Sequence, residues 1–216
     1  MSLDPTSANG LIREICTLAP IIPVLVIEDV GTARPLAEAL VAGGLPALEV
    51  TLRTPDALEA IRIMSEVSGG HVGAGTLITP DQVRAAKEAG ATFGVSPGVT
   101  DELLAACEEE ALPLLPGAAT VSEAMKLLAR GYSIAKFFPA EAAGGVPALK
   151  AMAAPLPQIS FCPTGGVSPN NAVSYLELNN VLCAGGSWVA PKELLAAGDW
   201  SGVQALAREA SILGKG

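Results

Sequence analysis

The sequence predicts an α/β protein of the (β/α)8 TIM-barrel class with an additional N-terminal helix, and three observations favour this class. Short apolar runs alternate with helical patterns along the whole chain, which is typical of a parallel sheet. After the first helix the alternation repeats eight times, as in a compact barrel. No linker or change in composition divides residues 1–216, so a single domain is expected. A doubly wound open sheet is the alternative, but it usually has fewer strands and needs a plausible sheet edge.

Each predicted strand is a short apolar run bounded by turn residues, the pattern of a strand buried on both faces. In chain order these runs are Ile21–Ile27, Ala47–Leu52, His71–Leu77, Thr92–Ser96, Leu112–Leu115, Ser133–Phe138, Gln158–Cys162 and Val181–Ala184. The helical patterns are Ser7–Leu18 and then Thr32–Val41, Pro55–Val67, Pro80–Ala89, Thr100–Glu110, Val121–Ala129, Val146–Met152, Pro169–Leu176 and Lys192–Ala197.

Several helix ends carry local signals. Thr54, Thr79 and Ser168 each stand directly before a proline, and a hydroxyl residue followed by proline is a typical helix start. Gly90 and Gly131 stand where two helical patterns end, and glycine is favoured just past a helix C-terminus. These five positions are expected to delimit helices.

The charge balance restricts the class of partner. The chain has a net charge of -9 and no basic cluster, so nucleic acid is not an expected partner. Half of the residues are hydrophobic and only 16% are charged, which indicates buried elements rather than disorder. A site for a small anionic substrate must therefore be local, built from backbone amides and one or two cations.

Cysteine and histidine usage indicates neither disulfides nor a metal. The cysteines lie far apart without a Cys-x-x-Cys pair, and the single histidine, His71, completes no familiar zinc pattern. Residues 1–10 do not resemble a signal peptide, and no apolar run reaches membrane-spanning length. We expect reduced thiols, no metal, no contact with a membrane and a cytoplasmic location. The cysteines are Cys16, Cys107, Cys162 and Cys183.

Lys136 is the most informative residue, because it interrupts the apolar run Ser133–Phe138. Alternation along a strand places it on the opposite face from Ala135 and Phe137. If both faces are buried, desolvation penalises the ammonium form, and the neutral amine is the nucleophilic form of lysine. A lysine paired with a carboxylate, or one reaching out from a strand end, is the structural alternative.

The second predicted strand carries its polar residues on one face. Glu49, Thr51 and Arg53 alternate with aliphatic residues, and in a barrel the aliphatic set must face the helices. The polar set then faces the interior or its mouth. Burying a glutamate there costs free energy, so a functional role for it is expected. An ion pair between Glu49 and Arg53 alone is the simpler alternative. A site that both residues share with Lys136 is preferred, because it also accounts for a glutamate in the interior.

Glycine-rich turns follow several predicted strands. Gly73-Ala74-Gly75-Thr76 matches no phosphate-loop motif; its glycines are interpreted as allowing the backbone to approach a ligand, with Thr76 offering a hydroxyl. Ser96-Pro97-Gly98 is mainly turn sequence whose position at the mouth can shape the pocket.

Paired glycines follow the last two predicted strands, at Gly165-Gly166 and Gly185-Gly186. In a barrel, this is where exposed amides hold a phosphate, and neutral amides suit an acidic protein. A phosphate site is therefore favoured over plain turns. His71 at the start of a strand and the solvated Glu108-Glu109-Glu110 helix end are interpreted as structural, and the cysteines as small apolar residues.

With these residues assembled, the chain resembles the family of 2-dehydro-3-deoxy-6-phosphogluconate (KDPG) aldolases, the Entner–Doudoroff lyases, which also includes 4-hydroxy-2-oxoglutarate aldolases. The resemblance covers essentially the whole chain. It is strongest at Val41-Ala42-Gly43-Gly44, Leu48-Glu49-Val50-Thr51-Leu52-Arg53-Thr54, Gly73-Ala74-Gly75-Thr76, Lys136-Phe137-Phe138-Pro139-Ala140-Glu141 and Phe161-Cys162-Pro163-Thr164-Gly165-Gly166.

The resemblance implies an aldehyde-lyase that cleaves KDPG to pyruvate and glyceraldehyde 3-phosphate, with 4-hydroxy-2-oxoglutarate as a further substrate. It implies a homotrimer and no cofactor. Lys136 would form the Schiff base and Glu49 would transfer protons. The implied substrate-binding residues are Arg53, Thr76, Pro97, Phe138, Thr164, Gly165, Gly166, Gly186 and Ser187.

Two other functions remain open. A phosphate-binding barrel isomerase or synthase would share the glycine pairs but would not need a lysine within a strand. A non-catalytic binder of sugar-acid phosphates would use Lys136 only as the ion-pair partner of Glu49. Formation of a reducible adduct with pyruvate separates the aldolase from both.

Overall fold

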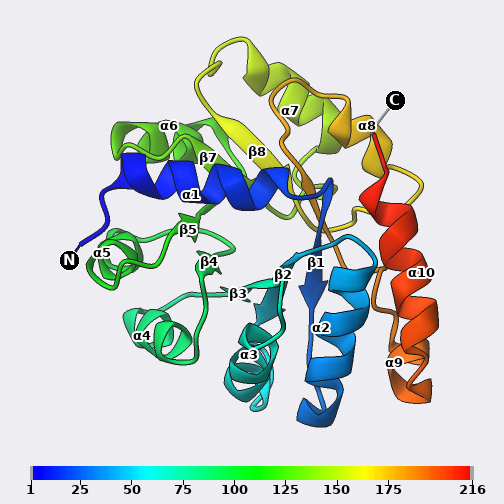
Figure 1. Cartoon of the computed structure of the whole chain (residues 1–216). Coiled ribbons are helices and arrows are strands. Elements are labelled where there is room, and N and C mark those ends of the chain that lie inside the picture. The colour runs from blue at the N-terminus through cyan, green and yellow to red at the C-terminus, as the bar shows by residue number, and fades with distance from the viewer. Residues whose placement is uncertain (1, 215–216) are drawn as a thin grey trace.

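The structure is a computed structural model that describes residues 2–214, and it alternates strands and helices along the chain (Figure 1). The strands are β1 Ile21–Leu25, β2 Ala47–Thr51, β3 His71–Gly75, β4 Phe93–Val95, β5 Leu114–Leu115, β6 Gly117–Ala118, β7 Ile134–Phe137, β8 Ser160–Pro163 and β9 Ala184–Gly186. The α-helices are α1 Pro5–Thr17, α2 Ala33–Ala42, α3 Ala57–Ser65, α4 Pro80–Glu88, α5 Asp101–Glu109, α6 Val121–Ala129, α7 Gly145–Ala153, α8 Ala172–Leu176, α9 Lys192–Ala197 and α10 Trp200–Ser211, and a 3-10 turn, η1, spans Val30–Thr32.

All strand pairs of the described chain are parallel. One sheet has the order β5-β4-β3-β2-β1-β9 and a second has the order β6-β7-β8. Only Pro116 separates β5 from β6. Two isolated parallel bridges, Phe161↔Val181 and Thr164↔Gly185, connect the β8 segment with the β9 segment. The parallel α/β architecture expected from the alternation of apolar runs and helical patterns is thereby confirmed.

Helix α1 is the predicted additional N-terminal helix, and it packs against the strand ends that lie away from the predicted site. Its buried face, Ile12, Ile15 and Cys16, forms an apolar cluster with residues such as Phe93 and Ile134, which open β4 and β7. Figure 1 shows α1 running beside β5 and β7. Because α1 covers the amino ends of the strands, an active site is expected at their carboxyl ends.

The outer faces of the strands pack under the helices, as alternation predicts. Ala135 and Phe137 of β7 belong to the large core that includes the helix residues Leu36, Ile61 and Leu127. Lys136, between them in the strand, faces the other way. The predicted separation of Lys136 from its two neighbours is confirmed.

Two predicted helix starts are wrong. The Thr54 hydroxyl donates to the Ile27 carbonyl at 2.6 Å instead of capping a helix, and α3 begins three residues later, at Ala57. Ser168 uses its backbone N–H to donate to the Asn171 side chain, and α8 begins only at Ala172. At Thr54 a contact with a distant strand overrides the local threonine-proline signal, whereas at Ser168 a local turn closed by Asn171 delays the helix.

Two further differences concern the second glycine pair and the C-terminal segment. Gly185 and Gly186 lie within β9, not after it. The sequence patterns also omitted α10, which packs against α2. Gly90 and Gly131, by contrast, follow α4 and α6 with φ of 98° and 96°, which confirms their predicted place past helix ends.

No helix within residues 2–214 has the combination of length and apolar composition that crossing a bilayer requires.

The start of α4 provides a stability prediction. Thr79 accepts a hydrogen bond from the Gln82 N–H at 3.3 Å, and Gln82 Oε1 accepts from the Thr79 N–H at 3.2 Å. Thr79→Ala removes this reciprocal cap and is expected to destabilise the protein by about 1 kcal/mol, measured by urea unfolding. Thr79→Ser retains the cap and is the control; equal stability of both variants would contradict the prediction.

Candidate active site

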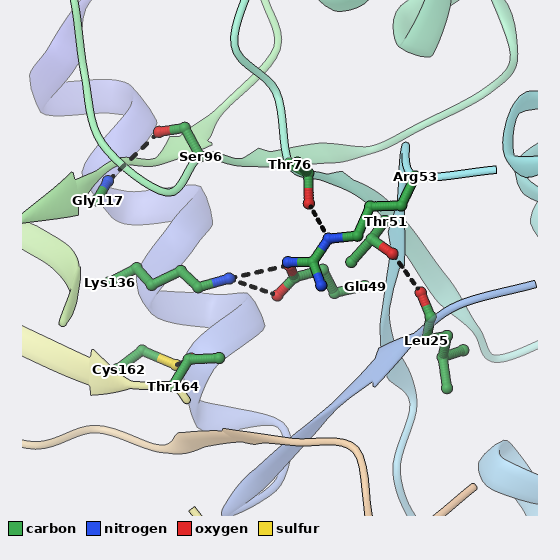
Figure 2. A network of polar contacts seen from close by, with 10 residues as sticks. All are labelled: Leu25, Glu49, Thr51, Arg53, Thr76, Ser96, Gly117, Lys136, Cys162 and Thr164. Carbon is green, nitrogen blue, oxygen red and sulfur yellow. Dashed lines mark hydrogen bonds and ion pairs between the residues drawn. The ribbon is translucent and has the colours of Figure 1, made fainter. Parts of the chain in front are cut away.

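Lys136 and Glu49 meet inside the protein, between the two sheets. Lys136 is the third of the four residues of β7, and Glu49 is the middle residue of β2. Lys136 Nζ lies 3.0 Å from Glu49 Oε1 and 3.4 Å from Oε2. The two side chains point toward one another in Figure 2, although their strands belong to different sheets. The two residues are only 4% and 2% exposed.

A buried pair of this kind is poor evidence for stability, because desolvating two charges costs about as much as their attraction returns. The pair does, however, have a chemical consequence for the amine. Glu49 provides a proton acceptor within hydrogen-bonding distance of an amine that water scarcely reaches. The ring of Phe138 lies 5.5 Å from Lys136 Nζ, so an aromatic face also borders the amine.

Glycines provide the space that this pair occupies. A Cβ on Gly75 would lie 2.3 Å from Glu49 Oε1, and one on Gly73 would lie 2.4 Å from the Phe93 ring. Protein side chains therefore fill the space beside the α-carbons of both glycines, and the approach of their backbone to a ligand stays a prediction.

Arg53 and Thr76 form a second polar group at the carboxyl ends of β2 and β3. Arg53 Nε donates to Thr76 Oγ1 at 3.1 Å (Figure 2). Arg53 has no carboxylate within 4.0 Å among residues 2–214, so the simpler alternative, an ion pair with Glu49, does not form. Thr76 has a φ of 62°, a strained backbone for a β-branched residue that is common at functional sites.

Ser96 and Pro97 lie beside the lysine strand. Ser96 is fully buried and its Oγ accepts from the Gly117 N–H at 3.3 Å, while a Cβ on Gly117 would lie 2.3 Å from the Pro97 carbonyl. Gly117 pairs with Lys136 in the sheet, so Pro97 lies one strand away from the amine. The sequence predicts Ser96 as the last residue of a strand and the start of a turn at the mouth, but no local signal marks its complete burial.

The predicted phosphate residues lie at neighbouring strand ends. Gly165 and Gly166 follow β8 with φ of 99° and 80°, where glycine is strongly preferred. The bridge between Thr164 and Gly185 places this turn next to the end of β9. Thr164 is buried, and a Cβ on Gly185 would lie 2.3 Å from its Oγ1.

Gly186 and Ser187 stand at the end of β9. The Trp188 ring covers the α-carbon of Gly186, since a Cβ there would lie 1.9 Å from it. Gly186 can therefore offer only its backbone, whereas Ser187, the first residue after β9, is exposed.

Among the residues interpreted as structural, Cys162 lies beside the site, because it pairs with Lys136 in the sheet and its Sγ is 4.0 Å from Thr164 Oγ1. His71 is exposed at the start of β3, and the four cysteines are free and buried. Glu108 is not a solvated charge, because it accepts from the Tyr132 hydroxyl at 3.1 Å and pairs with Arg130 at 3.3 Å. Within the described part of the chain, no cluster of three or more His, Cys, Asp or Glu side chains is arranged to hold a metal.

Comparisons with known proteins place this geometry in context. A family model described as KDPG and KHG aldolase matches residues 12–206. The KHG/KDPG aldolase of Escherichia coli (strain K12) is 53% identical over 199 residues, which are 92% of this chain and 93% of the relative.

Two solved structures share the fold with a TM-score of 0.89. The 2-keto-3-deoxy-6-phosphogluconate aldolase of Zymomonas mobilis ZM4, crystallised with 3-phosphoglycerate, is 52% identical and aligns over 94% of this chain and 95% of its own. The KDPG aldolase of Legionella pneumophila, with pyruvate captured at low pH as a covalent carbinolamine intermediate, is 48% identical and aligns over 92% and 97% of the two chains.

Proposed function

The chain belongs to the KDPG and KHG aldolase family, and from that premise we propose that it is a Schiff-base aldolase that cleaves KDPG to pyruvate and glyceraldehyde 3-phosphate. The observation that carries the proposal is the buried amine of Lys136, 3.0 Å from the Glu49 carboxylate. The pyruvate carbinolamine of the Legionella pneumophila relative supports the same chemistry. The name of the Escherichia coli relative supports a second activity, cleavage of 4-hydroxy-2-oxoglutarate to pyruvate and glyoxylate.

The two sheets are proposed to be parts of one closed (β/α)8 barrel formed by a single domain. If β5 and β6 count as one strand interrupted at Pro116, the bridge between Thr164 and Gly185 completes the circle. The contact between Lys136 on β7 and Glu49 on β2 crosses the interior of such a barrel. All the proposed site residues then lie within the interior or at the carboxyl-end mouth, where barrel enzymes have their active sites.

Imine formation begins with a proton. Glu49 takes one proton from the Lys136 ammonium, and the neutral amine attacks the keto carbon of the substrate, C2. The C–N bond forms as the carbonyl oxygen takes up a proton, which gives a carbinolamine. Loss of water from this intermediate leaves a protonated imine, a cation that withdraws electrons from C3.

Cleavage follows from that cation. Glu49 removes the proton from the C4 hydroxyl, and the C3–C4 bond breaks to release glyceraldehyde 3-phosphate. The electron pair of the broken bond moves into the imine and gives an enamine. The enamine methylene carbon takes a proton, and water hydrolyses the resulting imine to release pyruvate and the free lysine. One carboxyl group beside the amine can serve these steps because it alternately accepts and returns a proton. Glu49 gives the proton taken from Lys136 to the carbinolamine hydroxyl, which leaves as water, and later gives the proton taken from the C4 hydroxyl to the enamine carbon.

The remaining site residues are proposed to bind the two ends of the substrate. Arg53 and Thr76 hold the carboxylate next to the keto group, where the guanidinium offers several donors. Pro97 and Phe138 line the pocket. The backbone amides at Thr164, Gly165, Gly166 and Gly186, with the Ser187 hydroxyl, hold the phosphate. The homotrimer and the cytoplasmic location stay predictions; light scattering of the purified protein tests the first.

Reductive trapping tests the proposal. The protein is incubated with pyruvate and borohydride, digested, and mapped by mass spectrometry. We expect a reduced pyruvyl group on Lys136, because borohydride reduces the C=N bond of an imine to a stable amine. Incubation with lactate, which has no carbonyl, is the control. A folded protein without any adduct in excess pyruvate would overturn the aldolase and favour a phosphate-binding barrel of another activity.

A further inference from the structure

Glu141 and Tyr175 form a hydrogen bond directly behind the glycine turn that follows β8. The Tyr175 hydroxyl donates to Glu141 Oε1, although the two residues are 34 positions apart. Tyr175 is fully buried in α8, and Glu141 lies in the segment after β7. Burial, and then the bond to Glu141, raise the pKa of the Tyr175 hydroxyl, so the phenol remains a donor throughout the neutral pH range.

Glu141 is in direct contact with the turn. Its N–H donates to the Gly165 carbonyl at 3.1 Å, and the N–H of Ala140 donates to the Thr164 carbonyl at 2.8 Å. The stem of the Glu141 side chain packs on Gly166, since a Cβ on that glycine would lie 2.6 Å from Glu141 Cγ. Glu141, although exposed to solvent, is thus in direct contact with the backbone of Gly166.

Asn171 holds the same turn from the other side. Its Nδ2 donates to the Gly166 carbonyl at 3.0 Å, and its Oδ1 accepts from the Ser168 N–H at 2.8 Å. Asn171 precedes α8 and Tyr175 follows four positions later, a spacing that places both on one side of the helix. Gly166 is thus clamped between Glu141 and Asn171, both of which α8 positions.

The clamp orients the polar groups of the turn. The carbonyls of Thr164, Gly165 and Gly166 all accept hydrogen bonds from protein donors. Within residues 2–214, the N–H groups of Gly166 and Val167 donate to no protein acceptor. A turn whose carbonyls are engaged while its N–H groups are free is a concave anion site.

We propose that the Tyr175–Glu141 pair positions the turn at residues 164–167 for the phosphate of the substrate and thereby sets the preference for phosphorylated over unphosphorylated 2-keto acids. The inference rests on the proposed function, because it assigns a role to residues behind the phosphate site of that same aldolase. Both are positioning residues, since they act through the turn and not on the reacting atoms.

The test is Tyr175→Phe, which removes one hydroxyl. Kinetics are measured with KDPG and with 4-hydroxy-2-oxoglutarate, which has no phosphate. Loss of a hydrogen bond to a charged group predicts a rise in KM for KDPG of roughly ten-fold. The kcat for KDPG and both constants for 4-hydroxy-2-oxoglutarate are expected to stay unchanged, because uniform binding of the phosphate affects only KM. Inorganic phosphate is tested as a competitive inhibitor, and its inhibition constant should rise by the same factor as the KM for KDPG.

Tyr132→Phe is the matched control, because Tyr132 donates to Glu108 in the same way but lies before β7, at the amino end of the strands. It should lower stability without altering the preference between the two substrates. Two variants of Glu141 give a second comparison. Glu141→Ala should lose the preference for KDPG over 4-hydroxy-2-oxoglutarate, whereas Glu141→Gln retains an acceptor for the phenol and should keep most of it.

Two outcomes would count against the inference in different ways. If the unmodified enzyme does not prefer KDPG, the phosphate assignment of the proposed function fails, and the inference fails with it. If the enzyme prefers KDPG but Tyr175→Phe changes both substrates equally, or changes neither, the inference alone is overturned.

Discussion

Lys136→Arg is expected to abolish aldol cleavage, with a loss of about four orders of magnitude or more in kcat, as for other catalytic nucleophiles. The guanidinium can still pair with Glu49, so the buried charge of Glu49 keeps a partner and the fold is preserved. It stays protonated at any working pH, however, and cannot attack a carbonyl to form an imine. Release of glyceraldehyde 3-phosphate from KDPG is measured in a coupled assay, together with borohydride trapping of pyruvate.

The matched control is Lys150→Arg, because Lys150 is an exposed lysine on α7. That variant should cleave KDPG like the unmodified enzyme. Thermal unfolding of both variants separates loss of chemistry from loss of structure. Appreciable imine-dependent turnover by a folded Lys136→Arg protein would contradict the assignment of Lys136 as the Schiff-base residue.

Glu49→Gln is expected to lower turnover by about 10²- to 10⁴-fold, the usual contribution of a general acid–base group. The amide retains the size of the carboxyl group, and its oxygen still accepts a hydrogen bond from the lysine, so the fold and some imine formation should survive. Proton transfer at the substrate should not. The direct measurement is exchange of the pyruvate methyl protons with deuterated water, which requires imine and enamine formation but no C–C cleavage and should slow with turnover.

Glu88→Gln, at an exposed position on α4, is the control for this substitution and should exchange and turn over normally. The informative comparison is between trapping and turnover in Glu49→Gln. Retained adduct with lost exchange supports the proton-transfer role, whereas unchanged turnover would refute it. Loss of the adduct together with turnover would instead mean that Glu49 acts mainly by accepting the first proton from Lys136.

Much of the fold was predictable because its determinants are local. The strand of Lys136 was identified from six consecutive residues, since an apolar run with one lysine is recognisable without knowledge of any other segment. The capping box at Thr79 and the glycines after α4 and α6 were likewise predictable, because each depends on residues within one turn of helix.

The errors occurred where distant residues compete with local signals. Thr54 precedes a proline but donates to Ile27, 27 positions earlier in the chain. The glycines of β3 leave room for the side chains of Glu49 and Phe93, which come from other strands, so no local signal indicates this role. Gly185 and Gly186 lie within β9, and their pairing with β1 decides this.

The alternation of strands and helices and the facing of Lys136 and of the Glu49 strand were predictable from sequence alone. Alternation, helix periodicity and capping act over a few neighbouring positions, so they can be recognised in a single segment. Only the tertiary structure decided that Lys136 meets Glu49 across 87 positions, that Arg53 contacts Thr76, and that α8 clamps the turn after β8. These contacts depend on sheet pairing and on the space that neighbouring side chains leave, neither of which any one segment of the chain contains.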